Sequence, residues 1–306
     1  MCGIFTIINN KLTFNKEIVK TSFDKGNNRG PEDSKLIYNS DSIIFGFKRL
    51  AINGLDQKSG QPMTIDNVTV LCNGEIYNFK TLYDFMNIEP TTGSDCEVII
   101  RMYQKYGFEY TIKMLDGVFS IILYDTTNLS EEPKLFVARD PFGVRPLYVL
   151  EINENDTSDI TNNSELMKLN YTNENIFAFA SEVKSLSPLL NGNNNKLMFI
   201  KKDNNYDKTN NLLNDTKIIN KQNFYIHPFE PGTYSYYTKT LMVNSEWKPN
   251  IINKKYFTIF TPSTCLSQFN VNMNISYYEK IVFYLEEAVK KRVVGTTERP
   301  IACLLS

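Results

Sequence analysis

MCGIFTII, residues 1–8, places a single thiol directly before an unbroken strand-forming run. Residues 4–8 predict a β-strand that starts almost at the amino terminus. Methionine aminopeptidase tolerates a small second residue, so we expect Met1 to be removed and Cys2 to become the first residue. The free α-amine, with a pKa of about 7.7–8, could then take the proton of the Cys2 thiol, so that nucleophile and base share one residue. A buried cysteine that is second by coincidence is the alternative.

Beyond this strand, short apolar runs are separated by polar turns. Further runs that predict strands lie at 36–38, 43–47, 68–72, 117–124, 135–138, 146–150 and 176–180. Helical spacing predicts one helix over 16–25 and another from Glu97 to Tyr106, with Ser94 as its N-cap and Gly107 as its stop. Strand runs and helix runs without strict alternation indicate an α+β fold of antiparallel sheets covered by helices. Several strand runs are apolar throughout, which indicates sheets buried on both faces.

The composition excludes several classes of function. Lys and Arg number 33 against 34 Asp and Glu, so there is no basic footprint of a nucleic-acid binder. No apolar run reaches the roughly 18–20 residues of a membrane helix. The five cysteines form no CxxC pair, which argues against a zinc ribbon or a disulfide framework. The single histidine, His227, cannot build a His-rich metal site, so we expect no metal. The N-terminus also lacks the basic region and the long apolar run of a signal peptide, so we expect a cytoplasmic location.

Nine short motifs follow one another along the chain. They are CGI (2–4), RGP (29–31), RLAI (49–52), QP (61–62), NGEIYN (73–78), GSDCE (93–97), LDG (115–117), ARDPFGVRPLY (138–148) and ASEVK (180–184). In this order they resemble the class II glutamine amidotransferases, and among these the glutamine-hydrolysing asparagine synthetases most closely. The resemblance implies an amidotransferase domain over 2–235. Its expected fold is the four-layer αββα N-terminal-nucleophile hydrolase architecture, with two stacked antiparallel sheets between helices.

The resemblance also implies roles for particular residues. Cys2 would be the nucleophile, and the side-chain N–H of Asn73 with the backbone N–H of Gly74 would form the oxyanion hole. Arg49 would clamp the α-carboxylate of glutamine with its planar fork, and Asp95 would pair with the α-ammonium. The other residues of the expected glutamine site are Leu50, Ala51, Ile52, Asn53 and Glu75.

Each of these residues also has a structural interpretation. Arg49 could be a surface residue at a hairpin end, and Asp95 could compensate the dipole of the helix that follows it. Asn73 and Gly74 could form an ordinary turn. Four other residues of the motifs, which are expected to be structural, are Arg29, Arg139, Asp140 and Arg145. Departures from the family pattern are Asn28, Glu32 and the pair Asn53-Gly54.

The rest of the chain suggests a different organisation. The Asn-rich stretches 153–175 and 192–223 have a composition that cannot bury a core, so they are predicted to be largely disordered surface insertions. A linker is expected over 236–275. Residues 276–306 would begin a truncated synthetase domain, with an amphipathic helix over 276–294. The stretch ACLLS (302–306) resembles the start of the loop that binds the pyrophosphate of ATP in that family.

These observations predict a glutaminase that needs no cofactor and releases glutamate and ammonia from glutamine. In the complete enzyme, ATP and Mg²⁺ would support the synthesis of asparagine from aspartate, and a synthetase domain could act in trans or within an oligomer. One alternative is another class II amidotransferase, such as a phosphoribosylpyrophosphate or glucosamine-phosphate enzyme. The other is an inactive fragment that only binds a partner.

Overall fold

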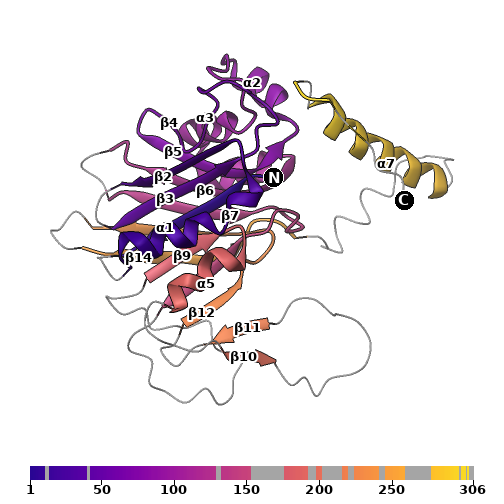
Figure 1. Cartoon of the computed structure of the whole chain (residues 1–306). Coiled ribbons are helices and arrows are strands. Elements are labelled where there is room, and N and C mark those ends of the chain that lie inside the picture. The colour runs from indigo at the N-terminus through magenta and orange to yellow at the C-terminus, as the bar shows by residue number, and fades with distance from the viewer. Residues whose placement is uncertain are drawn as a thin grey trace.

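Two antiparallel β-sheets form the centre of the computed structural model (Figure 1). The structure describes residues 1–10, 14–39, 42–128, 132–152, 176–191, 198–201, 216–219, 224–240, 245–258, 277–295, 298–300 and 302. The first sheet has the strand order β10-β11-β12-β8-β9-β1-β3-β2 and the second has the order β14-β13-β7-β6-β5-β4. Every strand pairing in them is antiparallel.

The strands of the first sheet are β1 (Gly3–Ile8), β2 (Asp33–Tyr38), β3 (Ile43–Arg49), β8 (Tyr148–Ile152), β9 (Ile176–Ala180), β10 (Met198–Lys201), β11 (Thr216–Ile219) and β12 (Phe224–Pro228). The predicted opening strand is β1, and all of its residues are buried. It pairs with β3 on one side and with β9 on the other. Cys2 therefore precedes a strand that is hydrogen-bonded along both edges, which fixes its position.

The strands of the second sheet are β4 (Met63–Ile65), β5 (Val68–Ile76), β6 (Gly117–Asp125), β7 (Lys134–Arg139), β13 (Thr233–Lys239) and β14 (Trp247–Lys255). β5 does not end at residue 72 as predicted but continues through Asn73 and Gly74 to Ile76. It pairs with β6 over this whole length, with Gly74 opposite Phe119. The Asn-Gly pair is therefore no turn, because pairing with a strand distant in sequence keeps it extended.

The helices are α1 (Lys16–Asp24), α2 (Phe79–Met86), α3 (Glu97–Tyr106), α4 (Phe108–Met114), α5 (Val183–Asn191) and α7 (Tyr277–Val294), with a 3₁₀ turn η1 at Asn27–Arg29. Three hydrophobic clusters define the layers. Phe45 and Ile122 lie in the cluster between the sheets, while Phe23 and Leu186 lie in the cluster that packs α1 and α5 on the first sheet. Ile99 lies in the third cluster, which packs α2, α3 and α4 on the second sheet. The predicted α+β fold with two stacked sheets between helices is confirmed.

The helix predicted to follow Ser94 forms, but Ser94 is not its N-cap. α3 begins at Glu97, and Cys96 occupies the cap position. The Ser94 carbonyl accepts a hydrogen bond from Glu97 N at 3.2 Å, so residues 94–97 make a turn that precedes the helix. The predicted end at Gly107 is confirmed, with Gly107 at a φ of 79°.

Two predicted segments contain strands that the sequence did not indicate. β14 lies within the expected linker 236–275, because the buried Trp247 packs between the sheets and its backbone is bound by Asn9. β10 and β11 lie within the expected insertion 192–223 and extend the first sheet. The remaining residues of that insertion, and all of 153–175, lie outside the described residues. So does the stretch 302–306, apart from residue 302.

The predicted amphipathic helix is α7, and its apolar side chains are exposed. Tyr278 is 82% exposed and Leu285 is 61% exposed. Figure 1 shows α7 beside the two-sheet body rather than on one of its layers. Among the helices that the structure describes, none combines the length and the apolar character needed to cross a membrane.

Candidate active site

One pocket brings together all ten residues of the predicted site. It is lined by Cys2, Arg49, Leu50, Ala51, Ile52, Asn53, Asn73, Gly74, Glu75 and Asp95, together with Met1, Phe47, Ser59, Gln61, Cys72, Ser94, Cys96 and Arg145. The residues before β1, the end of β3 with the loop that follows it, and the end of β5 supply most of these residues. The turn that precedes α3 and the segment between β7 and β8 supply the others. His227 is absent from this lining and lies on β12, where its Nε2 is 3.7 Å from Glu151.

Cys2 lies at the base of this pocket with its thiol against the backbone of Leu50. Its Sγ is 3.4 Å from both the amide nitrogen and the carbonyl oxygen of Leu50. Arg29 Nε donates a 2.7 Å hydrogen bond to the carbonyl oxygen of Cys2. Burial raises the pKa of the Cys2 thiol, while the Leu50 N–H and the amino terminus oppose that rise. The thiol therefore needs a nearby base before it can act as a nucleophile.

Asn73 and Gly74 lie beside Cys2 on β5. Asn73 is 1% exposed. In the amide orientation that gives both side-chain atoms a hydrogen-bond partner, the Asn73 nitrogen donates to Cys2 O at 3.0 Å. The Asn73 side-chain oxygen then accepts from Arg29 Nη2 at 3.3 Å. A Cβ at Gly74 would lie 2.3 Å from Val118 O, so only glycine lets β6 approach this closely. Sequence and packing thus keep one side-chain N–H and a glycine next to the thiol.

Arg49 ends β3 and is buried, which excludes the surface interpretation. Its guanidinium donates to the carbonyl oxygens of Gly54 and Asp56, the latter at 3.0 Å. Glu32, one of the departures from the family pattern, accepts a 2.7 Å hydrogen bond from Ala51 N. Arg49 therefore organises the loop that carries the predicted glutamine-binding residues 50–53.

Asp95 is a buried carboxyl group in the lining of the same pocket. Its Oδ2 accepts a 2.7 Å hydrogen bond from Ile76 N. Burial raises its pKa to about 6, and the negative charge of Glu75 adds to the rise, whereas hydrogen bonds from Ile76 N and the Asn53 side chain oppose it. The pocket thus holds one buried cation, Arg49, and one buried carboxyl group. A ligand with a carboxylate and an ammonium, as in an α-amino acid, matches this pair.

Comparison with known proteins identifies the family of the chain. Residues 1–248 match the family model described as a glutamine amidotransferase domain. The chain belongs to this family. The matched segment covers more than half of the chain and contains the entire pocket lining. It reaches beyond residue 235, the end of the predicted domain, into the part of the chain that contains β14.

The amidotransferase is also similar to individual relatives. A probable glutamine-hydrolysing asparagine synthetase of Acanthamoeba polyphaga mimivirus is 42% identical over 129 residues, which are 41% of this chain and 23% of that protein. A putative one of Methanocaldococcus jannaschii is 32% identical over 209 residues, or 61% of this chain and 35% of that protein. The asparagine synthetase of Gallus gallus is 40% identical over 154 residues, or 48% and 26%. The aligned part of this chain thus spans 23% to 35% of the length of these relatives.

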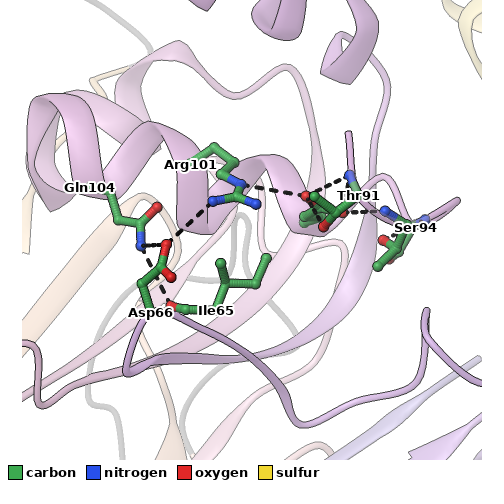
Figure 2. Close-up of polar contacts among 8 residues, drawn as sticks. Ile65, Asp66, Thr91, Ser94, Arg101 and Gln104 are labelled. Atoms are coloured by element: carbon green, nitrogen blue, oxygen red, sulfur yellow. Dashed lines mark hydrogen bonds and ion pairs between the residues drawn. The ribbon is translucent and has the colours of Figure 1, made fainter. Parts of the chain in front are cut away.

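Glu97 fixes the turn that carries Asp95, a role that sequence reasoning missed. Its carboxylate is fully buried and accepts hydrogen bonds from Thr91 N, Thr91 Oγ1 and Thr92 N, at 2.7–3.1 Å (Figure 2). These bonds outweigh the cost of burial and lower the pKa of Glu97. The signal was present in the motif GSDCE, where a carboxylate follows Asp95 at a spacing of two residues.

Arg101 and Gln104, one and two turns along α3, extend this network (Figure 2). The Arg101 guanidinium lies 3.5 Å from the Glu97 carboxylate and 3.5 Å from the Asp66 carboxylate. Asp66 belongs to the turn between β4 and β5. Gln104 donates to Ile65 O and to Asp66 at 3.4 Å. The network ties the Asp95 turn and the start of β5 to the same helix, so it acts on the pocket from outside.

The arginines and the carboxylate of the ARDPFGVRPLY motif are mainly structural, as predicted. Arg139 donates to the carbonyl oxygens of Gly143, Arg145 and Phe229 at 2.7–2.8 Å. Asp140 accepts from Val144 N and Arg145 N at 2.9 Å and so closes the turn after β7. Arg145 differs from the others, because it lines the pocket, contacts the Met1 side chain and lies 3.3 Å from Glu75.

Among the described residues, three free cysteines occur, and all three line the pocket. Cys72 and Cys96 are buried in the hydrophobic cluster between the second sheet and its helices. A side-chain hydrogen bond with Cys72, together with burial, raises the pKa of Cys96. These two thiols are therefore packing residues, which agrees with their predicted role, and Cys2 is the reactive candidate.

Proposed function

We propose that this amidotransferase hydrolyses glutamine to glutamate and ammonia, with Cys2 as its nucleophile. The single observation that supports the proposal most is the placement of the Cys2 thiol in one pocket with Asn73, Arg49 and Asp95. Such a pocket offers a nucleophile, an oxyanion donor and a pair of opposite charges for the α-amino acid end of the substrate.

The reaction begins after removal of Met1, which occupies part of the pocket lining. The α-amine of Cys2 then takes the proton of the thiol, which matters because burial raises the thiol pKa. Sγ attacks the side-chain amide carbon of glutamine, and the oxyanion is held by the Asn73 side chain and Gly74 N–H. Collapse with proton donation from the amine releases ammonia and leaves a thioester on Cys2. Water then attacks the thioester and releases glutamate.

Recognition of glutamine uses the two ends of the pocket. Arg49 binds the α-carboxylate, and the ionised Asp95 binds the α-ammonium. Because the pKa of Asp95 is raised to about 6, it is charged near neutral pH and loses this charge as the pH falls below that value. The residues of the loop 50–53 and Glu75 complete the substrate contacts.

The ammonia is proposed to serve the synthesis of asparagine, the reaction that gives the relatives their names. A synthetase part, whether in the same protein or in trans, would use ATP, Mg²⁺ and aspartate, and no described residue is proposed to hold ATP or Mg²⁺. A cytoplasmic location and a possible oligomer belong to the same proposal.

The test is glutamate release from glutamine by the purified chain beside its Cys2→Ala variant, with loss of Met1 verified by mass spectrometry. We expect release by the parent and none by the variant. A folded parent that has lost Met1 and yet releases no glutamate would refute the glutaminase assignment for this chain. It would favour the alternative that the chain is an inactive binding fragment.

A further inference from the structure

Glu298 and Arg299 bind the loop 51–56, which contains some of the predicted glutamine-binding residues, and its neighbour Glu32. The Glu298 carboxylate accepts hydrogen bonds from Gly54 N at 2.9 Å and from Leu55 N at 3.1 Å. Arg299 Nη2 is 2.7 Å from one oxygen of Glu32. The other oxygen of Glu32 accepts from Ala51 N. Residues 298–299 thus hold both ends of the segment 51–55, directly at one end and through Glu32 at the other.

The peptide unit between Gly54 and Leu55 is bound by both Arg49 and Glu298. Arg49 donates to the carbonyl oxygens of Gly54 and Asp56, while Glu298 binds the N–H groups of Gly54 and Leu55 from outside. Gly54 has a φ of 64°, and a Cβ there would lie 2.2 Å from Ser59 Oγ. The turn is therefore closely packed, and a shift of Gly54 would move the guanidinium that is proposed to bind the substrate carboxylate.

The end of α7 directs the chain towards this loop. Lys291 Nζ lies 2.5 Å from Asp116, which precedes β6. The Arg292 guanidinium lies 5.2 Å from the centre of the Tyr77 ring, directly after β5. Residues 298–299 follow within a few positions of these two contacts. All of these α7 and post-α7 residues lie outside the segment 1–248 that matches the amidotransferase family.

We infer that Glu298 and Arg299 are positioning residues for glutamine, supplied to the pocket from outside the matched amidotransferase segment. This inference rests on the proposed glutaminase function. They act through the loop 51–56 and Arg49 rather than by touching the reacting atoms. Loss of the Glu298 carboxylate therefore weakens binding of the glutamine α-carboxylate and leaves the chemistry at Cys2 in place. A rearrangement that withdraws 298–299 from the loop lowers the affinity for glutamine in the same way.

The test compares Glu298→Gln with the parent and with Glu286→Gln, a matched change of an exposed α7 glutamate. The amide can accept from only one of the two loop N–H groups and turns its own NH₂ towards the other. We expect KM for glutamine to rise about 3–10-fold in Glu298→Gln, with kcat changed less than about twofold. Glu298→Asp keeps the charge and should restore part of the loss, while Glu286→Gln should match the parent.

A second readout measures binding without turnover. Glutamine in the pocket should protect Cys2 from alkylation by iodoacetamide, and peptide mapping gives the glutamine concentration at half protection. This concentration should rise in Glu298→Gln by the same factor as KM, whereas the alkylation rate without glutamine should be unchanged. That unchanged rate distinguishes a positioning role from a general loss of structure.

Three outcomes would overturn the inference. Unchanged KM and unchanged protection in Glu298→Gln, with an active parent, would remove it while the glutaminase function stands. A fall of kcat as large as the fall of kcat/KM, with faster alkylation of Cys2, would assign Glu298 a role in folding instead. A parent that neither hydrolyses glutamine nor is protected by it would refute the proposed function, and the inference with it.

Discussion

Replacing Asp95 with Asn should make the protein more stable and nearly inactive at the same time. The carboxyl group is buried. Among the described residues, no Lys, Arg or His side chain forms an ion pair with it, and the nearby arginines Arg145 and Arg101 pair with Glu75 and Glu97 instead. Burial raises its pKa from 3.8 to about 6, which means that ionisation costs folding free energy. The proposed role of the charge is to bind the substrate ammonium, so on this proposal stability and function oppose each other at this residue.

The size of the effect follows from the pKa. A carboxyl group whose folded pKa exceeds its unfolded pKa stabilises the fold below the unfolded value, and this contribution is lost as the pH rises through the folded value. The pKa of Asp95 rises from 3.8 to about 6 on folding. At 1.36 kcal/mol per pKa unit, ionisation of Asp95 at pH 7.5 therefore lowers the free energy of unfolding by about 3 kcal/mol. Asn keeps the acceptor for Ile76 N but weakens the contact with Asn53, so we expect a net gain of about 1–3 kcal/mol. At pH 5 the gain should be about half as large.

Thermal unfolding of the parent and Asp95→Asn at pH 7.5 and pH 5 measures this difference, with Asp84→Asn on the exposed side of α2 as the control. We expect Tm to rise by about 2–10 °C at pH 7.5. In glutaminase assays kcat/KM should fall about 30-fold or more, because the substrate ammonium loses its partner. The KM of the parent should rise as the pH falls through about 6, the value of the Asp95 pKa.

Two results would refute this reasoning. A lower Tm of Asp95→Asn at pH 7.5, or a difference in Tm that does not change with pH, would show that the buried charge is not what destabilises the fold. An unchanged KM for glutamine in the variant would show that Asp95 does not bind the ammonium.

Two further predictions concern the oxyanion hole and the network behind it. Asn73→Ala should lower kcat for glutamine hydrolysis by about 10²–10³ in steady-state assays, because one oxyanion donor is lost; a change of less than threefold would contradict this. Glu97→Gln should cost about 1–3 kcal/mol in urea unfolding near neutral pH, because the amide cannot accept all the bonds that the carboxylate accepts. Since the pKa of Glu97 is lowered, this cost should shrink as the pH falls below about 4.5, and a cost that does not depend on pH would argue against a charged Glu97.

The residues of the proposed site were chosen from the sequence because nine motifs occur in the order of a known family. Taken one at a time, a cysteine at position 2, an Asn-Gly pair and an aspartate before a helix are each compatible with a purely structural role. The fully apolar runs also indicated central strands such as β1, β3, β6 and β9, since burial on both faces leaves a continuous hydrophobic pattern. All ten predicted site residues do line one pocket.

Contacts between distant parts of the chain decided the rest. The local sequence preference of the Asn73-Gly74 pair is for a turn. Pairing with β6 instead supplies hydrogen bonds for its backbone and keeps it in a strand. The attachment of Glu298 to Gly54 joins residues 244 positions apart. Local propensity extends over a few residues and carries no information about such partners. The sequence by itself therefore determined which groups can do the chemistry, and the tertiary structure determined what holds them in place.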